Sequence, residues 1–173
     1  MIDSNTLKDI LEGYKEYFPK HWNDEKFKWE AIKCFQDNWD VNADDFSDML
    51  SRSLSNTKNL LSSMNNFPRG MIEKFAKAAP EEVRSMFIAL FDETREIYER
   101  INEFKVQSSV MLEKYCKESK QHYQYENAIS TYLWLRYPDK YYIYQFTESK
   151  DIAEKLKSDS SIAKRDATPL VPA

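Results

Sequence analysis

The sequence contains very little glycine, and this shortage excludes several folds and one kind of site. Only 2 glycines and 6 prolines occur among its 173 residues. β-Sandwiches and β-barrels need a tight turn every few residues, so this composition argues against them. The same shortage excludes a phosphate-binding loop of the G-x-x-x-x-G-K-[ST] or G-x-G-x-x-G type, and neither motif occurs. The sequence therefore predicts a helical fold without a nucleotide-binding loop.

Histidine and cysteine are equally scarce. The two histidines, His21 and His122, and the two cysteines, Cys34 and Cys116, lie at no spacing typical of metal ligands. We therefore predict no metal and no other cofactor. Because the sequence has no secretion signal, we expect both cysteines to be reduced thiols in a cytoplasmic protein. A nucleophilic Cys116–His122 pair is the alternative, although a core thiol and a loop histidine are far more common.

Long apolar runs and an excess of basic residues are also missing. No run of about 18 apolar residues occurs, and the N-terminus lacks the order of a signal peptide, so we predict no membrane association. The net charge is −4; residues 1–67 carry 12 acidic and 8 basic side chains, residues 68–120 carry 10 of each and residues 121–173 carry 7 of each. A protein that holds duplex DNA through its phosphates normally has a basic face. DNA binding by this chain would therefore need a local patch.

What the sequence has in abundance is apolar side chains at helical spacing. It is 42% hydrophobic and 14% aromatic, which is too rich for a disordered protein. The spacing predicts helices over residues 5–18, 24–38, 45–64, 71–76, 80–91, 93–117, 127–137 and 147–156, with a loop at 65–70. In the 93–117 helix, apolar residues alternate spacings of four and three. We expect this coiled-coil-like seam to pack against another long helix of the same chain.

Residues 127–146, NAISTYLWLRYPDKYYIYQF, are the most strongly patterned stretch. Asn127 can cap a helix that Pro138 ends, and the residues from Tyr141 to Phe146 alternate as in a strand. We predict a mainly α-helical fold, a bundle-like single domain over residues 1–157 with one short β element near residues 141–146. Residues 158–173 are small, polar and rich in proline, which is typical of a flexible tail or linker.

Aromatic and basic side chains in this stretch are candidates for ligand binding. Aromatic rings stack on nucleic-acid bases while arginine and lysine hold phosphates. The other interpretation is that the rings pack in the core with a polar group at its edge, and this is favoured for Tyr132, Trp134 and Tyr142. An arginine at a helix start, in the loop F-P-R-G, could hold an anion. The predicted nucleic-acid-binding residues are Arg69, Trp134, Arg136, Tyr137, Lys140, Tyr141 and Tyr144.

Four segments carry a family resemblance. They are YENAISTYLWLRYPDKYYIYQF, KWEAIKCFQDNWD, NNFPRGMIEKFAKAAPEEVRSMFIALFD and HYQ. Together they resemble the helical N-terminal region of bacterial McrB-like proteins, which are AAA-type NTPases of modification-dependent restriction systems. The resemblance covers nearly all of residues 20–157 and is most specific from Ala128 to Tyr141. It implies a role in phage defence for a parent protein with a Walker-motif motor domain. That motor is missing from this chain, and the resemblance implies no catalytic residue here.

Two functions are compatible with these observations. The first is a non-catalytic specificity or targeting domain that recognises DNA, modified DNA included, for a separate motor domain. The alternative is a helical protein–protein interaction module that docks the motor, a nuclease subunit or another effector; the acidic first third and the 93–117 seam favour it. A positive aromatic groove would support DNA, and an exposed apolar patch would support a protein partner. A stand-alone enzyme that uses Cys116 or the carboxylates is a third, weaker hypothesis, since carboxylates interleaved with lysine on helix faces are usually solvated.

Overall fold

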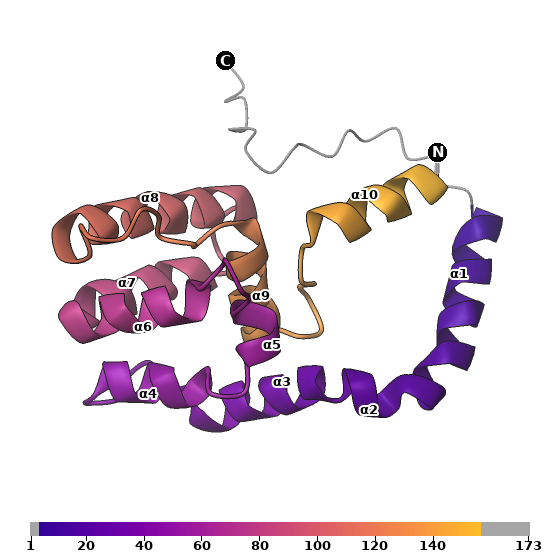
Figure 1. Ribbon diagram of the computed structural model, residues 1–173, viewed down its shortest axis with the longest axis horizontal. Helices are drawn as coiled ribbons and strands as arrows, with labels where there is room; N and C mark the ends of the chain where they lie inside the picture. The colour runs from indigo at the N-terminus through magenta and orange to yellow at the C-terminus, as the bar shows by residue number, and fades with distance from the viewer. Residues whose placement is uncertain (1–3, 157–173) are drawn as a thin grey trace, which may run out of the picture. The chain divides into compact units, whose positions relative to one another are not determined.

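The computed structural model describes residues 4–156, and this part of the chain is built from helices (Figure 1). They are α1 (Ser4–Tyr17), the 3₁₀ helix η1 (Phe18–His21), α2 (Trp22–Glu25), α3 (Phe27–Asn38), α4 (Phe46–Ser53), α5 (Lys58–Leu61), α6 (Pro68–Ala78), α7 (Pro80–Phe91), α8 (Ile97–Tyr115), α9 (Glu126–Arg136) and α10 (Phe146–Lys155). The prediction of a mainly α-helical fold is confirmed. The tail predicted over residues 158–173 lies outside the described residues.

The chain forms two compact units, which are described separately. Of the described residues, unit 1 comprises 4–25 and 144–156, and unit 2 comprises 26–143. Unit 2 therefore contains α3 to α9, and unit 1 contains α1, η1, α2 and α10. None of the described helices is long and apolar enough to cross a membrane.

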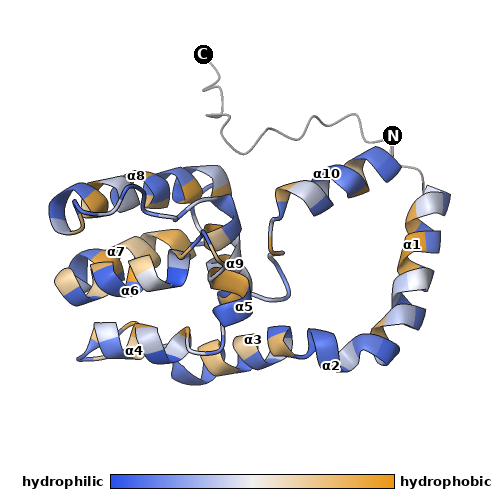
Figure 2. Ribbon diagram, in the orientation of Figure 1, coloured by the Kyte–Doolittle hydropathy of each residue, from blue (hydrophilic) through white to orange (hydrophobic). Residues whose placement is uncertain are grey.

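Unit 2 is held together by a core rich in aromatic rings. The Phe87 ring lies at the centre, with centroid distances of 5.3 Å to each of Trp39, Phe104 and Tyr132. Its helix, α7, packs against α4, α6, α8 and α9 and shows largely hydrophobic colouring, whereas hydrophilic and hydrophobic residues alternate along α8 (Figure 2). Large aromatic side chains bury much apolar area each, and edge-to-face ring pairs add a further contribution. This core joins helices from both ends of unit 2.

The seam predicted on the 93–117 helix is present on α8. Phe104, Ser108 and Met111 are buried, and α8 packs against α7 of the same chain. The outer seam positions, Ile97 and Tyr115, are exposed. The Ser108 hydroxyl donates a hydrogen bond to the Phe104 carbonyl oxygen at 2.7 Å, so a polar residue inside the seam is satisfied by its own helix. The expectation of packing within the chain is confirmed.

The prediction of one long helix from Asp45 to Met64 is wrong, because the helix is interrupted between the end of α4 and the start of α5. Thr57 is fully buried, and its hydroxyl donates to the Leu54 carbonyl oxygen at 2.7 Å. These contacts replace helical hydrogen bonds at the break. Met64 is 88% exposed instead of lying on a buried stripe. The loop predicted over 65–70 is also shorter than expected, since α6 already begins at Pro68; proline is favoured there because its missing N–H is not needed.

The short β element predicted near residues 141–146 is wrong. Within residues 4–156 there is no strand, and the one β interaction is an isolated bridge between Ser63 and Asn66. The Tyr141 N–H donates to the Tyr137 carbonyl oxygen at 3.1 Å, so Tyr141 belongs to the turn that follows α9. An alternating pattern forms a strand only where a second strand supplies hydrogen bonds. The following residues lead into α10, which begins at Phe146.

In unit 1, α1 is amphipathic but contributes no buried side chain. It ends at Tyr17, one residue before the predicted end at Phe18, and Pro19 lies inside the 3₁₀ helix that follows. The chain continues into η1, where the ring of Tyr17 stacks on the ring of His21 with a centroid distance of 3.6 Å. Contacts of this kind run along the helix surface rather than into a core.

Candidate functional site

The candidate site lies where α9 ends, and two features fix that end. The Tyr137 N–H donates to the Leu133 carbonyl oxygen at 2.8 Å, after which Pro138 prevents further helical turns. The last carbonyl groups of a helix have no partner within it. Here the Gln36 side-chain amide on α3 donates to the carbonyl oxygens of Leu135 at 2.6 Å and Arg136 at 2.9 Å. The turn that carries the candidate residues therefore follows a helix end that is hydrogen-bonded to α3.

Tyr141 and Lys140 enter a hydrogen-bonded network beyond this point. The Tyr141 hydroxyl accepts a hydrogen bond from Arg100 Nη2 at 2.8 Å and donates to Glu93 Oε1 at 2.6 Å. Lys140 Nζ lies 2.7 Å from the same Glu93 oxygen. Arg100 also donates to the Leu90 carbonyl oxygen at 2.8 Å. We call Glu93, Arg100, Lys140 and Tyr141 the Tyr141 network; it ties the turn after α9 to α7 and α8.

The Tyr141 network contains one carboxylate, Glu93, and two cations, Arg100 and Lys140. Hydrogen bonds from Lys140 and then Tyr141 lower the pKa of Glu93 below its usual value. The same contact raises the pKa of Lys140, so both groups stay charged near neutral pH. Arg100 is only 3% exposed; its two Nη atoms donate to the Leu90 carbonyl oxygen and the Tyr141 hydroxyl, whereas Nε has no hydrogen-bond partner among the described residues. Lys140 thus already has an anionic partner within the chain.

Two other candidates, Tyr137 and Trp134, contribute to packing. The Tyr137 hydroxyl donates to the Phe91 carbonyl oxygen at 3.0 Å, and its ring meets the Phe91 ring edge-on at 6.0 Å. Trp134 is half-buried and packs against the core of unit 2. Both side chains thus have a role in the packing of unit 2.

Arg136 differs from the other basic candidates. Its guanidinium lies 5.2 Å from the centroid of the Tyr137 ring, which is a cation–π distance. Across residues 4–156, no carboxylate forms an ion pair with it. Arg136 is therefore the candidate cation with the greatest capacity for an external anion.

The remaining candidates lie elsewhere. Arg69 is on α6, where Nε pairs with Glu73 Oε1 at 2.9 Å and Nη1 donates to the Ser55 carbonyl oxygen at 3.0 Å. It thereby holds the link between α4 and α5. Tyr144 belongs to unit 1. The structure thus brings Tyr137, Lys140 and Tyr141 together, next to Arg136, and gives Arg69 a separate role.

The sequence-based hypothesis of a Cys116–His122 pair gains no support from the geometry. Burial raises the pKa of the Cys116 thiol, which disfavours the nucleophilic thiolate. His122 Nδ1 accepts a hydrogen bond from the Gln124 N–H at 2.9 Å, and burial lowers the pKa of His122. In the part of the chain that the structure describes, no hydrogen bond joins the two side chains, and no cluster of His, Cys, Asp and Glu has a metal-binding arrangement.

No family model, curated protein or solved structure matches this chain. The likeness to McrB-like proteins therefore stays a prediction from the four segments that carry it.

Sequence reasoning missed three residues that matter here: Glu93, Arg100 and Gln36. A signal for Arg100 was present, because it lies four residues before Phe104 on the seam side of the 93–117 helix. A charged residue on a buried helix face requires partners. The hydrogen-bond partners of Arg100 could not be named, since Leu90 and Tyr141 lie 10 and 41 positions away in the chain.

Proposed function

We propose that this chain is a non-catalytic helical binding module of an McrB-like restriction system in the cytoplasm, and that its ligand is a protein. The candidate partners are the AAA motor and the nuclease subunit of the same system. The observation that carries this proposal is the apolar face of α1. Its members are Leu7 (38% exposed), Ile10 (38%), Leu11 (50%) and Tyr14 (50%).

The spacing of these four residues suits a helix that binds in a groove. They follow the pattern i, i+3, i+4 and i+7, which places all of them on one side of α1. Amphipathic helices that insert into a hydrophobic groove of a partner use this set of anchors. Exposed apolar side chains that lie together on one helix face are typical of interaction sites. We infer that α1 is the docking helix.

The charges in unit 2 support a protein ligand over DNA. Lys140 is paired with Glu93 and Arg69 with Glu73. Binding to phosphates would require these pairs to open, and salt-dependent DNA binding depends on cations that can displace counterions. Most of the predicted nucleic-acid contacts thus have a role inside the fold.

The test is a titration of this chain against the purified motor and nuclease proteins of the same system. We expect Leu11→Glu to weaken binding at least tenfold, because it places a charge in the middle of the apolar face. Lys15→Glu, a change at another exposed position of the same helix, is the control and should have little effect. Circular dichroism should show an intact fold in both variants, since α1 contributes no buried side chain. Failure of both proteins to bind, or equal binding by Leu11→Glu, would refute the proposal.

DNA recognition remains the second candidate because of Arg136 and Tyr142. Arg136 has no carboxylate partner among residues 4–156, and Tyr142 is 80% exposed. Single-stranded, duplex and methylated duplex DNA should be titrated at low and moderate salt. Under this hypothesis Arg136→Gln weakens binding and reduces its salt dependence, whereas Lys140→Gln has the smaller effect because Lys140 is already paired. Absence of binding at low salt would eliminate this candidate.

A further inference from the structure

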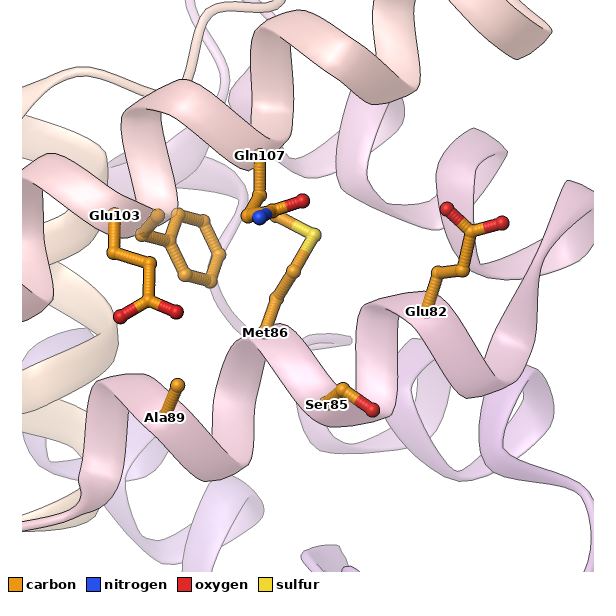
Figure 3. A pocket seen from close by; sticks show the side chains of 7 residues that line it. Glu82, Ser85, Met86, Ala89, Glu103 and Gln107 are labelled. Atoms are coloured by element: carbon orange, nitrogen blue, oxygen red, sulfur yellow. The ribbon is translucent and has the colours of Figure 1, made fainter.

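A pocket opens between α7 and α8, and none of its residues belongs to the Tyr141 network (Figure 3). Its volume is about 230 Å³. Sites for drug-sized molecules and cofactors are typically about 300–1,000 Å³, so this pocket suits a single side chain. It is lined by Glu82, Ser85, Met86 and Ala89 of α7 and by Glu103, Phe104 and Gln107 of α8.

The lining combines an apolar floor with acceptor groups at its ends. Met86 and Phe104 are buried, and Met86 points between the two helices, with Glu103 toward one end and Glu82 toward the other (Figure 3). No lysine or arginine lines the pocket. The pocket therefore favours a guest that has an apolar stem and a positively charged head, as long basic side chains do.

The two carboxylates differ in their capacity for a further partner. Both oxygens of Glu82 are engaged: Oε1 accepts from the Tyr115 hydroxyl at 2.6 Å, and Oε2 lies 3.2 Å from Lys114 Nζ. These contacts lower the pKa of Glu82. Glu103 pairs with Arg95 through Oε2 at 2.7 Å. Within residues 4–156, no hydrogen bond reaches its other oxygen or the Gln107 amide.

Glu103 and Gln107 stand one helical turn apart on α8, so their side chains lie on the same face. A carboxylate oxygen and an amide oxygen at this spacing can both accept from one planar donor. The guanidinium of arginine presents several N–H groups in a fork, whereas lysine presents a point charge. The free acceptor pair therefore favours arginine.

We propose that this pocket binds an arginine side chain of a protein partner. The stem lies against Met86, Ala89 and Phe104, and the guanidinium donates to Glu103 Oε1 and the Gln107 amide oxygen. This inference rests on the proposed function as a protein-binding module and adds the chemistry of the partner's contact segment.

The experiment is an NMR titration of the full chain, labelled with ¹³C at the methionine methyl groups. The probe is an arginine blocked at both termini, and blocked citrulline is the uncharged control of nearly the same shape. Met86 reports on the pocket, and Met64, which is 88% exposed, reports on non-specific effects. We expect a saturable shift of the Met86 methyl signal with arginine, a much weaker one with citrulline, and none at Met64.

Variants on α8 locate the head of the probe. Glu103→Gln should weaken arginine binding about two- to fivefold, the change expected for loss of one exposed ion pair. Glu113→Gln, on the same helix but outside the pocket, is the matched control and should leave binding unchanged. No Met86 shift, equal binding of citrulline, or equal binding by Glu103→Gln would overturn the inference.

The outcomes separate this inference from the proposed function. If the chain binds the motor or nuclease protein through α1 while the Met86 methyl signal does not shift with arginine, the pocket inference is wrong and the proposed protein-binding function stands. If Met86 reports arginine binding but neither protein binds, the proposed partners are wrong and the pocket's chemistry stands.

Discussion

Tyr141 shows how an apparent surface residue becomes a structural one. In the sequence it stands beside Lys140 and after the helix-ending Pro138, a setting that favours ligand binding. In the fold its hydroxyl lies between a buried arginine and a glutamate, at 2.8 Å and 2.6 Å. Each of these charged partners would lose a hydrogen bond without it. Because buried charges are costly without partners, we attribute the polarity of this turn mainly to the needs of Arg100.

The first residue-scale prediction concerns Tyr132, which is fully buried. Its hydroxyl donates to Gln124 Oε1 at 2.8 Å, and Gln124 in turn donates to the Pro68 carbonyl oxygen at 2.8 Å. Tyr132→Phe leaves the Gln124 oxygen buried without this donor, so we expect a loss of about 1–3 kcal/mol in the free energy of unfolding. Urea denaturation measures this. Tyr142→Phe, at an exposed position, should change the free energy of unfolding little. Equal losses for the two variants would contradict a stabilising role for the Tyr132–Gln124 hydrogen bond.

A second prediction tests the pairing of Lys140. Its hydrogen bond is the largest cause of the lowered pKa of Glu93. Lys140→Met removes that donor and its charge, so the pKa of Glu93 should rise toward its usual value near 4.5. Carboxyl ¹³C shifts followed from acid to neutral pH measure this. Asp92 is the internal control, because Thr94 is the main cause of its lowered pKa. An unchanged pKa of Glu93 would mean that Lys140 does not pair with Glu93 and is available to bind a phosphate.

At the scale of single helices, the sequence predicts a helix end correctly where the residues that stabilise that end are close in sequence. Pro80 begins α7 with Glu81 and Glu82 in its first turn, as predicted. The break between α4 and α5 was not predicted, because Arg69 approaches it from α6 to reach the Ser55 carbonyl oxygen. The strand predicted at 141–146 is absent for a similar reason, because a strand needs a neighbouring strand as hydrogen-bond partner. Tyr141 instead forms its hydrogen bonds with Tyr137, Arg100 and Glu93 of unit 2.

The element-scale prediction concerns the start of α4. Asp45 Oδ1 accepts a hydrogen bond from the Asp48 N–H at 2.9 Å, which caps the helix. Asp45→Ala should lower the free energy of unfolding by about 0.5–2 kcal/mol. Asp44→Ala removes a neighbouring charge without removing the cap and is the matched control. If thermal and urea denaturation give equal losses in the free energy of unfolding for the two variants, the Asp45 cap contributes nothing beyond its charge.

For the whole chain, the position of the core predicts which part folds independently. Every member of the main hydrophobic cluster lies between Ala31 and Leu135, within unit 2. We expect a fragment of residues 26–143 to be helical and to unfold cooperatively, with a urea midpoint close to that of the whole chain. A fragment of residues 26–125 lacks α9 and so loses Ile129, Tyr132 and Leu133 from the core; it should not unfold cooperatively. A disordered 26–143 fragment would show that unit 1 is required.

The sequence alone determined the helical class, the ends of several helices and the seam of α8, because these depend on side-chain spacing and on caps within a few residues. Only the tertiary structure decided which polar groups are satisfied inside the chain. Lys140 and Tyr141 meet Glu93, and Arg69 meets Ser55, across separations that no local pattern encodes. The candidate nucleic-acid residues were identified by type, and type does not reveal whether a charge already has a partner. Burial and distance do, and they follow from how the helices pack.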